Sequence, residues 1–267
     1  MSPSQPPQLL DAFVDETAFA LNGRPVLIYG TVVTPSLPAA IKAEEQIRTQ
    51  YRLPKDLEIK WALQHHDPGL KATVKQELLG SLSKHFRWLV TIHAGADKDA
   101  AFLGALQQIQ AYALAMSVPH VNVSFDEGTF RTRALVEAAL ADWEGVRCTN
   151  FARATSKHSV GLEYADMLAG AFGYMVQTLF TGRSTVARAP ADGHGYFEDW
   201  NVDAIIGVML RWSSWGVQPE WGPDGPTSDE DMIRDCLGRG VVLEGDFSEE
   251  ERVRLRRLTQ FWLGCTR

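Results

Sequence analysis

The stretch Leu9–Thr17, LLDAFVDET, governs how the rest of the chain is interpreted. An apolar run, Ala12-Phe13-Val14, ends abruptly in two acids, Asp15 and Glu16. A run of this length and composition predicts a buried strand over residues 9–16. Because side chains alternate along a strand, the two acids should face opposite sides, and one of them can face a cleft. Taken alone, the stretch favours the plainer interpretation, a strand that ends in a turn with solvated acids.

The composition is that of a globular protein. The chain has 267 residues, of which 45% are hydrophobic and 22% charged, enough for a full core in one large domain or two. The formal net charge is −7. This charge argues against a protein that coats nucleic acid through bulk positive charge, but it leaves a local basic groove open.

The cysteines and the start of the chain bear on location. Cys148, Cys236 and Cys265 are widely spaced and form no CxxC pair, so neither a zinc site nor a disulfide framework is indicated. The start, MSPSQPPQ, lacks the basic and apolar regions of a secretory signal, and no apolar run is long enough to span a membrane. We therefore expect a cytoplasmic protein without a membrane partner.

The spacing of apolar residues and turn signals predicts strands that alternate with helices. A turn signal at Asn22–Pro25 separates two apolar runs, so residues 9–16 and 25–33 should form a hairpin. Further strands are predicted at 87–93, 120–125 and 146–154, and helices at 39–51, 71–86, 97–117, 129–143 and 160–180. This order predicts an α/β fold, a mixed sheet with helices on its faces.

The character of the chain changes after residue 183. Residues 1–183 should form the α/β domain, and residues 184–267 a mainly helical C-terminal extension packed on the same domain. Helices are predicted in this extension at 196–215, 231–237 and 248–263. Ser248 and Glu251 have the spacing of a capping box at the start of the last helix.

Four carboxylates stand where strands or helices should bring them to one site. Asp15 and Asp126 each end an apolar strand, and α/β sheets build their sites at strand ends. Asp166 lies in an apolar helix, where an unpaired carboxylate is costly, and Glu58 lies in a short alternating segment, 57–61. Converging carboxylates repel one another unless a cation neutralises them, and hard oxygen ligands suit Mg²⁺ or Mn²⁺.

Several of these assignments have plainer alternatives. Glu58 is equally well explained by an ion pair with Lys60 on the surface. Glu127 competes with Asp126 for the position at the strand end. Glu163, three residues before the helix aspartate, is more simply a solvated or supporting acid than a metal ligand.

The order of these motifs resembles domain of unknown function 3800, a family of the ribonuclease H-like superfamily. The matching motifs are Phe13-Val14-Asp15-Glu16, Glu58-Ile59-Lys60-Trp61, Val123-Ser124-Phe125-Asp126-Glu127 and Tyr164-Ala165-Asp166-Met167-Leu168-Ala169-Gly170. Their order and spacing agree with the family from about Leu9 to Phe180, roughly two thirds of the chain. The chain departs from the family pattern at Glu163, where the family often has Gln, and at Thr17-Ala18, where it has Ser-Gly.

The resemblance implies a ribonuclease H-like mixed sheet whose carboxylates bind two divalent ions, Mg²⁺ or Mn²⁺. The implied metal ligands are Asp15, Glu58, Asp126 and Asp166, and Glu163 would add a fifth acid. Such a site hydrolyses phosphodiester bonds of nucleic acid. Lys60 would hold a phosphate oxygen or orient a water, and the candidate substrate contacts are Lys157, His158 and Arg131.

A second hypothesis is a ribonuclease H-like protein that has kept the fold as a non-catalytic binding or assembly module. The acidic net charge is its main support, and fold does not fix activity. The sequence leaves open whether DNA or RNA is the substrate, whether cleavage is internal or terminal, and whether the chain self-associates.

Overall fold

The computed structural model describes residues 8–55, 57–61, 74, 77–78, 85–155, 159–181 and 241–255. The strands are β1 (Leu9–Leu21), β2 (Arg24–Thr34), β3 (Arg87–Ala94), β4 (His120–Phe125), β5 (Arg147–Arg153) and β6 (Val241–Gly245). The labelled helices are α1 (Leu37–Gln50), α3 (Lys98–Ala115), α4 (Arg133–Ala141) and α5 (Val160–Thr181), and residues 249–255 are also helical.

The six strands form one mixed sheet in the order β5-β4-β1-β2-β3-β6. β1, β2 and β3 form an antiparallel meander, and the predicted hairpin of the first two strands is confirmed. β4 lies parallel to β1, β5 lies parallel to β4, and β6 lies parallel to β3. The predicted α/β class with a mixed sheet and flanking helices is therefore confirmed.

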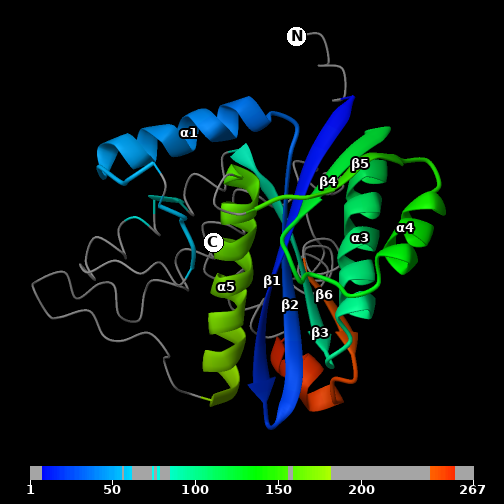
Figure 1. Cartoon of the computed structure of the whole chain (residues 1–267). Helices are drawn as coiled ribbons and strands as arrows, with labels where there is room; N and C mark the ends of the chain where they lie inside the picture. The colour runs from blue at the N-terminus through cyan, green and yellow to red at the C-terminus, as the bar shows by residue number, and fades with distance from the viewer. Residues whose placement is uncertain are drawn as a thin grey trace, which may run out of the picture.

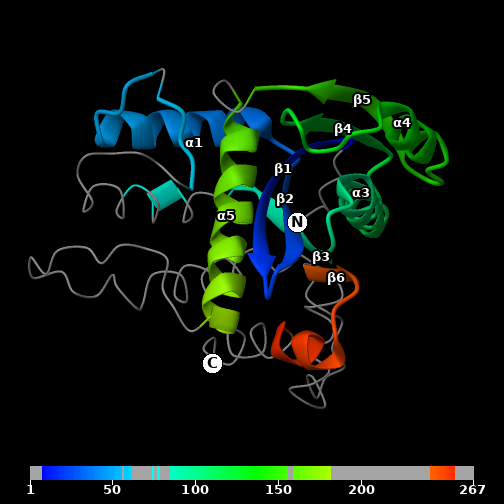
Figure 2. The same cartoon turned by 60° about the horizontal axis from the view of Figure 1, so that its bottom comes forward.

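Helices cover both faces of the sheet. α5 and α1 lie on one side of the central strands, and α3 and α4 lie on the other (Figures 1 and 2). Each side has its own hydrophobic core. Phe13 and Ile28 pack with α5 residues such as Leu168, whereas Val14 packs with α3 residues such as Phe102. Alternate residues of β1 thus enter opposite cores, as a strand requires.

Two glycines let α5 lie close to the sheet. A Cβ at Gly30 of β2 would lie 2.5 Å from the carbonyl oxygen of Ala165 and 2.6 Å from the backbone nitrogen of Ala169. A Cβ at Gly161 would collide with the ring of Phe13. These glycines therefore set the distance of α5 from β1 and β2.

Most predicted boundaries agree with the structure, but one helix is shorter than predicted. Asp97 caps α3 as predicted, accepting a hydrogen bond from the Ala100 N–H at 3.1 Å. The predicted helix over 129–143 is shorter, Arg133–Ala141, because residues 126–132 form a loop anchored to the sheet. In this loop the Thr129 carbonyl accepts a hydrogen bond from the Tyr29 hydroxyl at 2.5 Å.

The C-terminal part that the structure describes holds an unpredicted strand, β6, at the sheet edge next to β3. The predicted extension therefore adds a strand to the main sheet and is not purely helical. The predicted capping box is confirmed: the Ser248 N–H donates to Glu251 at 2.8 Å and the Glu251 N–H donates to the Ser248 hydroxyl at 3.2 Å. The helices predicted at 196–215 and 231–237, and most of the one at 71–86, lie outside the described residues.

None of the described helices combines the length and the hydrophobicity that a membrane-spanning segment requires.

Candidate functional site

Asp15 lies in β1 on the face covered by α5. It pairs with Gly30 of β2, and only 7% of its surface is exposed. Its neighbour Glu16 faces the other side, where its carboxylate pairs with the Lys98 ammonium at 2.7 Å. The predicted alternation of the two acids is confirmed, and Glu16 forms a structural ion pair with Lys98.

Asp126 follows β4 and lies beside Asp15. Val14 pairs with Phe125 in the parallel register, and the Asp126 N–H donates to the Val14 carbonyl at 3.3 Å. The Asp126 side chain is half-buried, and its Oδ1 accepts the Glu127 N–H at 2.7 Å. Two strands distant in sequence thus end their apolar runs side by side, each with an aspartate.

Asp166 comes to the same region from α5. The contact of α5 with Gly30 places Ala165 directly over the strand that pairs with Asp15. Asp166 Oδ2 accepts the Trp61 N–H at 2.5 Å. The helix carboxylate therefore lies between β1 and the 57–61 segment.

The pKa of Asp15 shows that these acids act on one another. The pKa of Asp15 is raised from 3.8 to about 8, most by burial, next by the charge of Asp166, and less by the charges of Glu16 and Asp126. The hydrogen bond from the Glu16 N–H opposes the shift. Asp15 is therefore a desolvated carboxylate with acidic neighbours from a second strand and a helix.

The same acids do not already form a closed ligand set. Within the described part of the chain, no three His, Cys, Asp or Glu side chains are grouped closely enough to hold a metal ion. Electrostatic repulsion acts over a longer range than a metal–oxygen bond of about 2.0–2.6 Å. Binding of a cation would thus require rotation of the half-buried side chains of Asp126 and Asp166 towards Asp15.

Glu58 and Lys60 approach the acids from the 57–61 segment. Their side chains pair with each other, with the Lys60 Nζ 3.0 Å from the Glu58 Oε1. Burial lowers the pKa of Lys60, but the hydrogen bond to Glu58 and the charges of Glu58, Asp166 and Asp15 outweigh it and raise the pKa overall. Lys60 therefore brings a positive charge near Asp166 and Asp15.

Glu163 is placed differently from the other predicted ligands. Its buried carboxylate accepts two hydrogen bonds from the Arg48 guanidinium, at 2.9 and 2.8 Å, and a third from the Ile59 N–H at 3.2 Å. Burial and the neighbouring Glu44 carboxylate raise the pKa of Glu163, against the effect of Arg48. Glu163 is one turn from Asp166 but is fully engaged in this buried contact.

Of the predicted substrate contacts, the one that the structure describes, Arg131, is not gathered at the acids. Arg131 is exposed, and its backbone N–H donates to Asp99 of α3 at 2.6 Å, which places it in the loop on the α3 side of the sheet. Lys157 and His158 lie outside the described residues.

The sequence interpretation missed Arg48 and Glu44 of α1. Arg48 contacts Glu44 at 2.5 Å and reaches Glu163 on α5. The spacing of Glu44 and Arg48, four residues apart on a predicted helix, was the available signal for a pair, but it did not indicate that the pair is buried.

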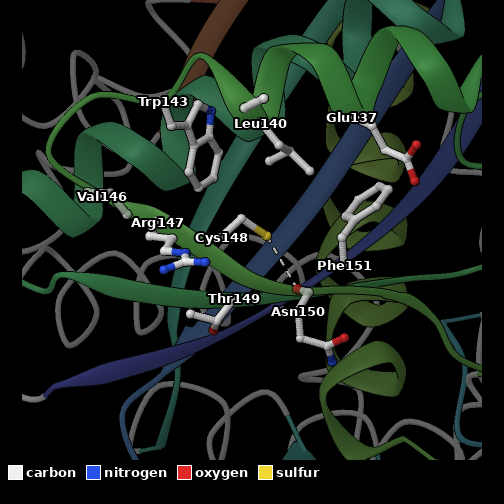
Figure 3. Close-up of a pocket in the computed structure, with 10 residues that line it drawn as sticks. Glu137, Leu140, Trp143, Val146, Arg147, Cys148, Thr149, Asn150 and Phe151 are labelled. Atoms are coloured by element: carbon white, nitrogen blue, oxygen red, sulfur yellow. Dashed lines mark hydrogen bonds between the residues drawn. The ribbon is translucent and has the colours of Figure 1, made fainter.

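A cavity of about 540 Å³ lies elsewhere, between α4 and the edge strand β5. Figure 3 shows the Trp143 and Leu140 side chains over it, with Arg147 at its rim and the Cys148 Sγ hydrogen-bonded to the Asn150 carbonyl at 3.3 Å. Trp143 and Leu140 pack against the core on the α3 side. This cavity is therefore separate from the acids, which face α5.

The donor set of the acid site suits a hard divalent cation. Asp15, Asp126 and Asp166 supply only carboxylate oxygens, the ligands that Mg²⁺ and Mn²⁺ prefer. A cation there would also offset the desolvation of the Asp15 carboxylate and its repulsion by the neighbouring acids, the two effects that raise its pKa. The chemistry of these donors thus fits such an ion, provided that the side chains rotate together. Comparison of the chain with known protein families and with curated proteins finds no match in either.

Proposed function

We propose that this protein is a metal-dependent hydrolase of nucleic-acid phosphodiester bonds, built on a ribonuclease H-like core. The single observation that carries the proposal is the buried carboxylate of Asp15, whose pKa is raised to about 8 by burial and by acids from α5 and β4. Perturbed acids drawn from separate elements are typical of functional sites.

The sheet supports the same proposal. The order β5-β4-β1-β2-β3, with an antiparallel meander and two further parallel strands, is compatible with a ribonuclease H-like core. Helices follow β3, β4 and β5 in turn. The motifs that resemble domain of unknown function 3800 lie in β1, in the 57–61 segment, at the end of β4 and in α5.

Asp15, Asp126 and Asp166 would hold Mg²⁺ or Mn²⁺, with Glu58 reaching in from the 57–61 segment. Two such ions, when bound, lower the pKa of a water and stabilise the leaving oxygen. Lys60 carries its charge beside the acids and would bind a non-bridging phosphate oxygen. Glu163, held by Arg48, would support the site without touching the ion.

The test is cleavage of single-stranded, duplex and hybrid substrates, DNA and RNA, with Mg²⁺ or Mn²⁺. Asp15→Asn should abolish cleavage and lose Mn²⁺ binding in calorimetry while the fold, measured by circular dichroism, is retained. The neighbouring Glu16→Gln, on the opposite face, is the matched control and should keep both. A fully active Asp15→Asn protein would refute the assignment.

The alternative, a non-catalytic binding or assembly module, is favoured by one observation. Asp166 already accepts the Trp61 N–H and Glu58 already pairs with Lys60, so both acids have structural partners without a cation. This alternative predicts a wild-type protein that neither cleaves any of the substrates nor binds Mn²⁺.

A further inference from the structure

The 57–61 segment is held in place by side chains of two helices. It runs beside α5 outside the strands of the described sheet. Its Ile59 N–H donates to Glu163 at 3.2 Å, and its Trp61 N–H donates to Asp166 at 2.5 Å. Two backbone donors, two residues apart, thus bind two acids one helical turn apart on α5.

Arg48 of α1 joins this segment to both helices. Its Nη2 donates to both carboxylate oxygens of Glu163, at 2.9 and 2.8 Å, and its Nε donates to Glu44 at 2.5 Å. Its Nη1 donates to the Leu57 carbonyl at 2.7 Å. Only 15% of the Arg48 side chain is exposed. A planar guanidinium fixes all of these partners in one geometry, which a lysine ammonium cannot reproduce.

The residues just beyond this contact are the ones that approach the acids. Ile59 is buried in the core, with 1% of its surface exposed. Glu58 and Lys60, on either side of it, form their ion pair, and the charge of Lys60 interacts with Asp166 and Asp15. The hydrogen bonds of the Leu57 carbonyl and the Ile59 N–H therefore fix the backbone from which the Glu58 and Lys60 side chains extend.

We propose that Arg48 is a positioning residue: by holding the Leu57 carbonyl and Glu163 together, it sets the distance of Lys60 and Glu58 from Asp15. The inference rests on the proposed function, since it concerns the same site. Arg48 touches neither the acids at β1 and β4 nor the substrate, and it acts through the 57–61 segment.

The first measurement is steady-state cleavage by Arg48→Lys. Arg24→Lys is the matched control, because Arg24 also binds both oxygens of one carboxylate, Glu251, and a backbone carbonyl, that of Asp246. This control contact lies at the hairpin end of β2, away from the acids. A displacement of the order of 1 Å predicts that Arg48→Lys lowers kcat by about 10- to 100-fold, with Arg24→Lys within about twofold of wild type. Both variants are assayed at a temperature at which circular dichroism shows that they keep the native structure.

A double-mutant cycle with Lys60→Ala separates positioning from general destabilisation. If Arg48 acts through the segment, Arg48→Lys lowers kcat by a smaller factor once Lys60 is truncated, because only the positioning of Glu58 is then left to lose. Full additivity of the two losses would overturn the proposal, because Arg48 would then act independently of Lys60.

Hydrogen exchange gives a readout that does not depend on activity. The amides of Ile59 and Trp61 should exchange faster in Arg48→Lys, while those of Val14 and Phe125 in the sheet should not. Unchanged exchange at Ile59 and Trp61 would overturn the proposal. A wild type that neither cleaves nor binds Mn²⁺ ends the proposed function and this inference with it, whereas an active wild type with an equally active Arg48→Lys ends this inference alone.

Discussion

Replacement of Asp15 by Asn should make the metal-free protein more stable. Burial and the neighbouring acids raise the pKa of Asp15 from 3.8 to about 8. At neutral pH the side chain is therefore ionised in the unfolded chain and protonated in the folded one. Because the folded-state pKa is the higher of the two, the stability of the wild type falls as pH rises from the unfolded value towards 8.

The size of the effect follows from this difference. Each pH unit above the unfolded pKa removes about 1.4 kcal/mol from the free energy of unfolding, so the loss at neutral pH is about 4 kcal/mol. Asn does not ionise, and its side-chain oxygen can still accept the Glu16 N–H. Asp15→Asn should therefore raise the free energy of unfolding of the metal-free protein by up to about 4 kcal/mol at neutral pH and by almost nothing near pH 4.

The assay is urea unfolding in the presence of a chelator at acidic and neutral pH. The gap in free energy between Asp15→Asn and wild type should widen as pH rises, whereas Glu16→Gln should show no such gain. Saturating Mn²⁺ should then stabilise the wild type but not Asp15→Asn, because only the former keeps the ligand. A variant no more stable than wild type at neutral pH would refute the reasoning that Asp15 is strained by its surroundings.

The affinity for Mn²⁺ should rise about tenfold per pH unit until the pH reaches the pKa of Asp15, since a ligand must lose its proton to bind; calorimetry across this range measures it, and a flat profile would exclude Asp15 as a ligand. Gly30→Ala should lower the free energy of unfolding by about 1–3 kcal/mol and weaken Mn²⁺ binding, because the added Cβ pushes Ala165 and its helix away from the sheet. Denaturant unfolding and calorimetry measure the two effects. Unchanged values would contradict the prediction, because α5 would then accommodate the added Cβ without moving the acids. Because burial and Glu44 raise the pKa of Glu163 from 4.5 to about 9, stability should decline as pH rises between these two values, and Glu163→Gln should reduce that decline in unfolding curves. Parallel curves for wild type and variant would contradict this account.

Local pattern was sufficient for most of the sheet. The apolar run before Asp15, the turn at Asn22 and the strict alternation of His120–Phe125 each fix one element through nearby residues alone. β1 continues to Leu21, beyond the predicted end, because its partner strand supplies hydrogen bonds past the two acids. β6 was missed because a five-residue strand at an edge depends on the strand it joins.

The candidate site divides in the same way. The alternation of Asp15 and Glu16, and the position of Asp126 at a strand end, follow from strand geometry and could be predicted. The burial of Glu163 could not, since its partner Arg48 is 115 residues away in the sequence. Contacts of that separation depend on how helices pack, which the local spacing of charges does not encode.

The glycine contact between β2 and α5 has a consequence for how the site can vary. At Gly30 the helix rests on the strand through backbone atoms alone, so the gap between the two is set by the thickness of the polypeptide itself. Replacing Leu168 or Ile28 by another apolar side chain would alter stability without altering the spacing of Asp15 and Asp166. The architecture thus separates changes in the core side chains from the alignment of the acids, and a bulkier residue at this backbone contact would change both together.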